Sequence, residues 1–357
     1  MAAPRIVIKI GSNVIAHADG TVNVPLLQHL CDQIATLHGQ GWEPLVVSSG
    51  AVASGRSQIK IPKKSDPVTQ RQLLAAIGQT RLINTYTQLL EPHGLICAQV
   101  LVTKEDFRGR RHYLNIRHCL ETILQHRAIP IVNENDVVSV TELMFTDNDE
   151  LAGLVAAMID ADRLVLLTNV SGIYDRPPGD PGARLIERAS TETDFTGMIS
   201  TEKSDFGRGG MLTKVRMAQK TAAMGVGVHI ANGNQPDILL SITQSAPPGT
   251  FFVPQKKITG IKRWIGHAEG YVQGSVLIND GAVKALSHNR HATSLLLIGV
   301  TAIQGEFERN DIVHLRTESG EVFGIGRIQY SSQEASARIG EHGHKPLVHY
   351  DHLYLYP

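Results

Sequence analysis

Short apolar segments alternate with longer segments of helical periodicity over the first 254 residues of this 357-residue chain. The apolar segments, each of a length typical of a strand, are residues 5–10, 44–48, 95–103, 129–132, 163–168 and 226–231. Helices are expected after Asn23, a candidate cap, and over 70–90, 113–127, 151–159 and 211–224. Strands that are apolar throughout are buried on both faces, and strands that alternate with helices form parallel sheets. The pattern therefore predicts an α/β fold, a three-layer α/β/α sandwich around a mostly parallel sheet.

The character of the sequence changes after Pro254. Residues 255–270 carry four Lys or Arg residues and are expected to form a linker. From residue 271 onward glycine is frequent and helical periodicity is sparse, so strands are expected at 295–298, 312–315 and 322–329 and one helix at 281–286. We therefore expect a large domain over residues 1–254, a linker over 255–270 and a small β-rich domain over 271–357.

Charge and composition argue against several classes of protein. The chain has 34 Lys and Arg residues against 34 Asp and Glu residues, so it lacks the overall basic field of many nucleic-acid and membrane-surface proteins. Its longest apolar stretch, residues 151–159, is shorter than the ~20 residues of a membrane helix, and Lys9 interrupts the first apolar run, so no signal core is expected. The three cysteines, Cys31, Cys97 and Cys119, are expected to be reduced core residues of a cytoplasmic protein.

Two clusters with phosphate-binding character follow expected strands, although neither a Walker A loop nor a G-x-G-x-x-G motif is present. Lys9-Ile10-Gly11-Ser12 ends the first strand, and ligands of parallel sheets bind beyond the carboxyl ends of strands. There a lysine beside a glycine whose backbone amides can approach an anion suits a phosphate. Ser48-Ser49-Gly50-Ala51 stands before a helical segment, whose first amides bind anions. A solvated lysine and an ordinary serine cap are the alternatives.

Two further polar clusters also lie next to expected strands or helices. Asn133-Glu134-Asn135-Asp136 follows the strand at 129–132, and Asp147-Asn148-Asp149 precedes the apolar helix at 151–159. Asp147 alone could be a helix cap, since Glu150 stands at capping-box spacing, but the remaining polar residues favour a compact polar pocket.

In residues 207–215, glycines precede a helix with Thr213 and Lys214 in its first turn, which suits a polyphosphate. A flexible loop with a surface lysine is the alternative.

Taken in order, these clusters resemble the glutamate 5-kinase group of the amino-acid kinase family, and the match extends over nearly the whole chain. The supporting stretches are 8–12, 48–55, 72–79 (Gln72-Leu73-Leu74-Ala75-Ala76-Ile77-Gly78-Gln79), 132–136, 147–149 and 209–214. Residues 271–357 resemble the PUA domain that many of these kinases carry, particularly at 274–282.

The resemblance implies ATP-dependent phosphorylation of the γ-carboxylate of L-glutamate, the first step of proline biosynthesis, with Mg²⁺ bound to ATP. It implies that Lys9 and Lys214 contact the transferring phosphoryl group and that Asp149 holds both lysines in place. The glutamate-binding residues that it implies are Ser49, Asp136 and Asn148, with Asp136 suited to the ammonium group. The nucleotide-binding residues that it implies are Lys9, Thr168, Asn169, Arg208, Gly209, Gly210, Met211, Leu212, Thr213 and Lys214. Asn169 and Arg208 depart from the Asp and Thr usual in the family, on the nucleotide side of the site.

The residues agree with this chemistry. A glutamate side chain has a reference pKa of about 4.3, so it is an anionic nucleophile at neutral pH and needs no general base. Catalysis then depends on in-line positioning and on cations that neutralise the phosphoryl charge. A related kinase acting on aspartate or acetylglutamate is the nearest alternative, and Asp136 argues against acetylglutamate because a carboxylate favours a free ammonium group.

The remaining expectations concern regulation and partners. The resemblance implies a homo-oligomer, dimer or tetramer, and feedback inhibition by proline, with residues 58–67 as a candidate regulatory loop or a plain surface loop. Residues 271–357 carry seven Lys and Arg against nine Asp and Glu, which argues against RNA binding by the PUA-like domain and favours a structural or regulatory role. Four histidines near the carboxyl end are expected in a solvated tail rather than a metal site, namely His342, His344, His349 and His352.

Overall fold

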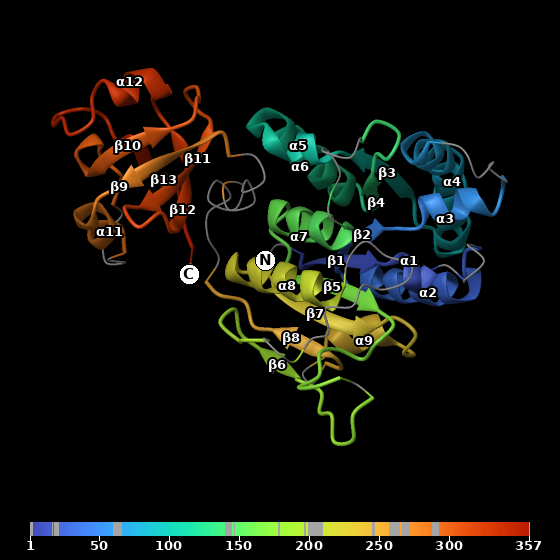
Figure 1. Ribbon diagram of the computed structural model, residues 1–357. Coiled ribbons are helices and arrows are strands. Elements are labelled where there is room, and N and C mark those ends of the chain that lie inside the picture. The colour runs from blue at the N-terminus through green and yellow to red at the C-terminus, as the bar shows by residue number, and fades with distance from the viewer. Residues whose placement is uncertain are drawn as a thin grey trace. The chain divides into compact units, whose positions relative to one another are not determined.

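The computed structural model describes residues 3–15, 17, 21–59, 66–139, 145, 147–177, 179–195, 198, 210–244, 247–256, 265, 272–287 and 293–356. The chain divides into two compact units, Met1–Lys257 and Ile258–Pro357, each with its own sheet and core (Figure 1). The division falls inside the expected linker, most of which lies outside the described residues, so the linker's exact bounds stay a prediction.

The first unit contains an eight-stranded sheet in the order β3-β4-β2-β1-β5-β7-β8-β6. Its strands are β1 Arg5–Ile10, β2 Glu43–Ser48, β3 Cys97–Val102, β4 Ile129–Glu134, β5 Arg163–Thr168, β6 Arg188–Ala189, β7 Gly227–Asn232 and β8 Thr250–Phe252. The central strand β1 pairs in parallel with β2 and with β5, and among the described pairings of this sheet only that of β7 with β8 is antiparallel. The predicted mostly parallel sheet is confirmed.

Helices cover both faces of this sheet. They are α1 Ser12–Ile15, α2 Val24–Gly39, α3 Ala51–Arg56, α4 Pro67–Leu90, the short 3₁₀ helix η1 Glu91–His93, α5 Lys104–Arg108, α6 Arg110–Gln125, α7 Asn148–Met158, α8 Met211–Ala223 and α9 Ile238–Ile242. Helices α2, α4 and α9 share one core with the isoleucines at 6, 8 and 10 of β1. Because side chains alternate along a strand, Lys9 points to the other face, where α7 and α8 lie side by side (Figure 1).

Local capping explains where three of these helices begin. The side chain of Asn23 accepts a hydrogen bond from the backbone N–H of Leu26 at the start of α2. Asp66 accepts from Thr69 at the start of α4. Asp147 accepts from the first two backbone amides after Asn148 in α7. Such caps satisfy amides that have no partner within the helix. The predicted cap Asn23 is confirmed, and the alternative interpretation of Asp147 as a helix cap is also correct.

The second unit is built on a five-stranded sheet in the order β10-β9-β11-β12-β13. Its elements are β9 Gly274–Ile278, α11 Asp280–Ser287, the 3₁₀ helix η4 Leu297–Gly299, β10 Val300–Gln304, β11 Ile312–Thr317, β12 Val322–Ile328, α12 Ser332–Ser336 and β13 Val348–Leu355. Buried apolar side chains from β9, β11, β12 and β13 form a separate core, so the predicted small β-rich domain is confirmed.

Several local expectations for this unit are wrong. Residues 295–298 are not a strand: Leu295 makes an isolated bridge to Val348, and η4 follows before β10 begins. A continuous apolar run does not reveal where a strand starts. Strands β9 and β13 are absent from the sequence prediction, and His349 and His352 lie on β13 rather than in a solvated tail. Polar side chains along β13 hide its strand character in the sequence.

The cysteine expectation is only partly right. Cys31 is buried on α2, but Cys97 is half-buried and Cys119 is exposed. The buried residues of α6 are Tyr113, Leu120 and Leu124, so Cys119 lies on the face of this helix that points away from the core. Cys119 has apolar neighbours in the sequence, but on an amphipathic helix the position around the helix axis decides which residues are buried. All three cysteines are free.

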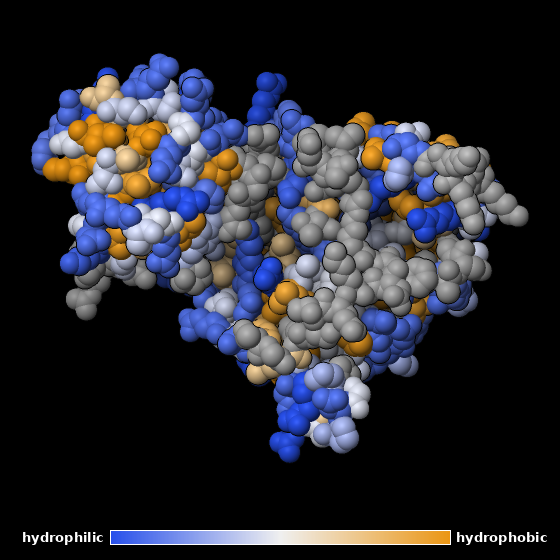
Figure 2. Space-filling model, in the orientation of Figure 1, coloured by the Kyte–Doolittle hydropathy of each residue, from blue (hydrophilic) through white to orange (hydrophobic). Residues whose placement is uncertain are grey.

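No helix in the described ranges is long and apolar enough to span a membrane. Figure 2 shows that hydrophilic residues predominate on the face seen in Figure 1, with apolar residues in separate patches. Residues 138–145, whose sequence could form a small hairpin, lie largely outside the described residues, as do residues 60–65 of the candidate regulatory loop.

Helices α3 and α4 touch backbone to backbone at two glycines. A Cβ atom added to Gly78 of α4 would overlap the carbonyl oxygen of Ala51, and one added to Gly55 of α3 would overlap that of Leu74. The contact fixes α3 directly after the turn at Ser49 and Gly50, where Gly50 has a φ of 102°. This explains why two glycines stand inside helices, where glycine costs stability.

We expect Gly78→Ala to lower the free energy of unfolding by about 1–3 kcal/mol or more, because the two helix backbones must separate. Urea unfolding followed by circular dichroism measures this change. The matched control is Gly39→Ala at the exposed end of α2, where an added Cβ meets no atom within 4 Å. This control should be neutral or stabilising by about 0.5–1 kcal/mol, and equal losses in both variants would contradict the packing argument.

Candidate active site

Two lysines converge on one buried carboxylate at the carboxyl edge of the sheet. Lys9 near the end of β1 places its Nζ atom 2.7 Å from Oδ1 of Asp149, in the first turn of α7. Lys214, in the first turn of α8, places its Nζ atom 2.7 Å from Oδ2 of the same residue. Residues more than 200 positions apart in the sequence thus meet because α7 and α8 both cover the face to which Lys9 points.

The electrostatics of this group keep the carboxylate charged. The side chain of Asp149 is only 1% exposed, and Lys9 is also buried. Burial raises the pKa of Asp149, but the two ammonium groups outweigh burial and hold this pKa below its usual value. Two ammonium groups therefore lie where the strand and the two helices meet, with the carboxylate of Asp149 between them and that of Asp147 close by.

Asp147 ties the beginnings of the two helices together. Its Oδ1 atom caps α7, and its Oδ2 atom accepts a hydrogen bond from the hydroxyl of Thr213 on α8 at 3.0 Å. Burial raises the pKa of Asp147, and the neighbouring Asp149 charge adds to the rise. Both helices therefore start beside the lysines, where the positive ends of helix dipoles favour an anion.

Asn148, the first residue of α7, links the start of this helix to the ends of β2 and β4. Its Nδ2 atom lies within hydrogen-bond distance of the Ser48 carbonyl (3.0 Å), the Ser49 hydroxyl (2.9 Å) and Oδ1 of Asn133 (3.1 Å). Asn133 in turn donates to Oε1 of Gln79 on α4 at 2.9 Å. The clusters after β2 and β4 and the start of α7 thus form one polar group.

A cation that the sequence analysis missed completes this polar group. Arg71 of α4 donates from Nε to Oδ1 of Asp136 at 2.9 Å, and its Nη2 atom also contacts Oδ1 and lies 3.5 Å from Oε2 of Glu134. Burial raises the pKa of Glu134 to about 7, although the Phe145 backbone amide donates to this carboxylate at 3.0 Å. Because a buried carboxylate needs a cationic or hydrogen-bonding partner, Glu134 and Asp136 at the end of a buried strand predict that a cation lies nearby. The sequence does not indicate which Lys or Arg residue this cation is.

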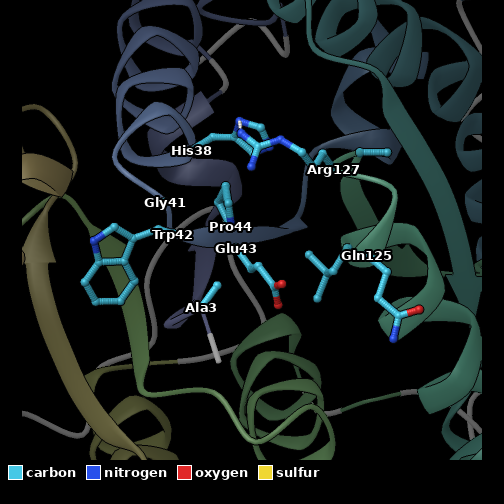
Figure 3. Close-up of a pocket in the computed structure, with 10 residues that line it drawn as sticks. Ala3, His38, Gly41, Trp42, Glu43, Pro44, Gln125 and Arg127 are labelled. Atoms are coloured by element: carbon cyan, nitrogen blue, oxygen red, sulfur yellow. Dashed lines mark hydrogen bonds between the residues drawn. The ribbon is translucent and has the colours of Figure 1, made fainter. Parts of the chain in front are cut away.

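A separate pocket lies at the opposite end of β2 (Figure 3). It is lined by His38 and Trp42, by Glu43 at the start of β2, and by Arg127, whose Nη2 atom lies 3.3 Å from Nδ1 of His38. Burial lowers the pKa of His38, and Arg127 lowers it further. Ligands of parallel α/β sheets bind at the carboxyl ends of the strands, so the polar group around Asp149 is the better candidate for the active site.

Family models match both units of the chain. Residues 4–232 match the amino acid kinase family, and residues 274–350 match the PUA domain. The first match spans more than half of the chain. The chain belongs to the amino acid kinase family.

Named relatives agree with this family membership. The chain is 48% identical to the glutamate 5-kinase of Bacteroides thetaiotaomicron, over 98% of each chain. It is 47% identical to the glutamate 5-kinase of Chlorobaculum tepidum, over 99% of this chain and 98% of that one. The isopentenyl phosphate kinase of T. acidophilum, in a solved product complex, has a TM-score of 0.50 at 18% identity and covers 69% of this chain and 99% of that one. This last likeness shows the fold alone.

The residues expected on the nucleotide side are only partly described. Thr168 ends β5, the neighbour of β1 in the sheet, and its hydroxyl lies 3.3 Å from Oδ1 of Asn169. Gly210 caps α8, and Met211, Leu212, Thr213 and Lys214 form its first turn. Arg208 and Gly209 lie outside the described residues. No hydrogen bond or ion pair within the described residues joins Thr168 or Asn169 to the lysines, so their nucleotide role stays a prediction.

Asp149→Asn should lower the free energy of unfolding by about 3–5 kcal/mol at neutral pH, because it removes the carboxylate that pairs with the buried ammonium group of Lys9 and the partly buried one of Lys214. Urea unfolding of the ligand-free protein measures the loss. Glu150→Gln is the matched control on the same helix, since Glu150 forms a partly exposed ion pair with Lys104 at 3.3 Å. That control should cost less than about 1 kcal/mol, and an Asp149 variant as stable as the control would contradict the ion-pair argument.

Proposed function

We propose that this chain transfers the terminal phosphoryl group of ATP to the γ-carboxylate of L-glutamate, giving L-glutamyl 5-phosphate and ADP, the first step of proline biosynthesis. The observation that carries the proposal is the Lys9–Asp149–Lys214 group beside the polar group of Asn148 and Asp136. Relatives named glutamate 5-kinase, similar over almost their whole length, support the choice of substrate.

The reaction needs charge neutralisation rather than proton transfer. An oxygen of the γ-carboxylate attacks the terminal phosphorus of ATP, and the bond from that phosphorus to the bridging oxygen of ADP breaks. Both reactants are anions, so two ammonium groups at the point of transfer lower the barrier. Asp149 is too well neutralised to act as a base, and it keeps Lys9 and Lys214 in place. The amides at the start of α8 add donors for the phosphates.

The substrate and nucleotide lie on opposite sides of the lysines in this proposal. Ser49 and Asn148 orient glutamate, and Asp136 accepts its ammonium group. An acetylated amine carries no charge and could not form this ion pair with Asp136, so N-acetylglutamate is disfavoured. ATP is bound by Thr168, Asn169, the Gly210 turn and Lys214, together with the preceding residues Arg208 and Gly209.

Mg²⁺ is proposed to enter with the nucleotide. This ion keeps several waters and binds through phosphate oxygens, so it needs few protein ligands. Within the described ranges, no three His, Cys, Asp or Glu residues are grouped as a metal site, and the two Asp149 oxygens already face ammonium groups. This arrangement is compatible with an ion carried by ATP, which supplies further positive charge at the phosphates.

A hydroxamate assay tests the reaction directly, because hydroxylamine traps an acyl phosphate. The purified protein is incubated with ATP, Mg²⁺ and L-glutamate, and then with L-aspartate or N-acetylglutamate in place of glutamate. We expect a hydroxamate signal selective for L-glutamate and dependent on Mg²⁺. ADP release with another acid, but not with glutamate, would keep the kinase reaction and reject the substrate.

Proline inhibition, a homo-oligomeric state and a cytoplasmic location stay predictions. Addition of proline to the same assay tests the first, and light scattering of the purified chain distinguishes a dimer or tetramer from a monomer. A structural or regulatory role for the second unit, rather than RNA binding, also stays a prediction.

Lys9→Ala and Lys214→Ala should each lower kcat by about 10²–10³-fold and change the KM for glutamate much less, because the lysines act on charge that develops during transfer. Steady-state hydroxamate rates measure both constants. Lys220→Ala on α8 is the matched control and should leave both constants nearly unchanged. Equal effects of the active-site variants on kcat and KM would indicate a role confined to binding.

A further inference from the structure

The Arg71–Asp136 ion pair carries two unused hydrogen-bonding positions of opposite charge. Arg71 uses Nε and Nη2 toward the two acidic residues, whereas its Nη1 atom has no partner within the described part of the chain. Asp136 uses Oδ1, and its Oδ2 atom likewise has no partner there. A guanidinium has five donors in a fixed fork, so one arginine can hold Asp136 and a second carboxylate at the same time.

Burial makes this pair more than a surface ion pair. The Asp136 side chain is 8% exposed and that of Glu134 is 4% exposed, while Arg71 is 25% exposed. The arginine is therefore the more accessible partner, and solvent screens the pair only weakly. Glu134 accepts a hydrogen bond from the Phe145 amide and lies 3.5 Å from Nη2 of Arg71, so this second carboxylate favours the observed place of the guanidinium.

The pair lies at the opposite end of the polar group from the lysines. Asn148 lies next to the lysine site because the following residue, Asp149, pairs with both lysines. On its other side, Asn148 donates a hydrogen bond to Asn133, which precedes Glu134 on β4. The order along the site is therefore lysines, Asn148 and Ser49, Asn133, and then the Arg71–Asp136 pair. An L-glutamate whose γ-carboxylate reaches the lysines must present its other end, an ammonium group and a carboxylate on one carbon, to the far side.

We propose that Arg71 binds the α-carboxylate of the substrate while Asp136 binds its α-ammonium group, so that the ion pair recognises the zwitterionic head of an α-amino acid. This inference rests on the proposed function and adds a specificity-determining residue to it. The head group is electrically neutral, so it can join the pair without leaving a charge unmatched. An acid without an α-carboxylate, or one whose α-carboxylate is blocked, would leave Nη1 unpaired and would bind more weakly.

Arg71→Gln tests this assignment against L-glutamate and its α-amide, L-isoglutamine, which keeps the γ-carboxylate and the ammonium group. Dissociation constants come from calorimetry, and kcat/KM comes from ADP release. We expect Arg71→Gln to lower the affinity for L-glutamate by about 10- to 100-fold but to change the affinity for the α-amide by less than about threefold. The variant would then no longer discriminate between the two ligands. Arg71→Lys, which keeps the charge but not the fork, should retain part of the discrimination.

Asp136→Asn provides the complementary measurement with glutarate, which lacks the ammonium group. This variant should lose affinity for L-glutamate but not for glutarate. Arg81→Gln on the same helix is the matched control, because Arg81 is exposed and donates a long hydrogen bond to the Ser57 hydroxyl at 3.4 Å, away from Asp136 and Glu134. Thermal melting confirms that each variant is folded.

The outcomes separate this inference from the proposed function. If the unmodified protein forms no acyl phosphate from L-glutamate, the proposed function fails. If the unmodified protein forms the acyl phosphate, but Arg71→Gln lowers the affinities for glutamate and for the α-amide equally, Arg71 serves only to neutralise Glu134 and Asp136. The inference is then wrong. Equal affinity of the unmodified protein for glutamate and the α-amide would also overturn it.

Discussion

The buried carboxylate of Asp149 between two ammonium groups is the interaction on which the rest of the site depends. A lone carboxylate or a lone ammonium group would be costly at this depth, and the three charges are tolerable only together. Their convergence requires that Lys9 point to one face of β1 and that α7 and α8 both begin there. The sheet order and the helix caps can therefore be understood as the conditions for keeping these three side chains within ion-pair distance.

Charge is distributed unequally along the polar group. The lysine end has the two ammonium groups of Lys9 and Lys214 against the carboxylates of Asp149 and Asp147, and the starts of α7 and α8 add positive helix-dipole ends that favour a transferring phosphoryl group. The other end has one guanidinium against two carboxylates, and burial raises the pKa of Glu134 there to about 7. Between them stand neutral amides and hydroxyls, including those of Asn148 and Ser49. A substrate with an anionic tail and a zwitterionic head matches this gradient, which is the physical basis for assigning an acidic amino acid to the site.

The two glycines of the α3–α4 contact show how packing serves the site at a distance. Neither Gly55 nor Gly78 touches the lysines, yet their close approach holds α3 against α4. Helix α3 begins directly after the Ser49 turn, and α4 carries both Arg71 and Gln79. The backbone contact thus sets the spacing between the serine turn and the arginine, which is why larger side chains are excluded there.

The sequence by itself determined the order of the six longer strands and the five longer helices of the first unit, its mostly parallel sheet and the cap Asn23, because hydrophobic periodicity and capping are local properties. The short elements α1, α5, α9, β6 and β8 were not predicted, because segments of two to five residues show no clear period. It also indicated the polar clusters, since each follows a strand or precedes a helix. That Asp149 lies between Lys9 and Lys214 was implied by the family resemblance and by no local pattern, and its geometry comes from the tertiary structure. Only the tertiary structure decided that Arg71 is the partner of Asp136 and that β13 exists. These depend on strand order and helix rotation, which bring together residues far apart in the chain, and no local pattern encodes such pairings.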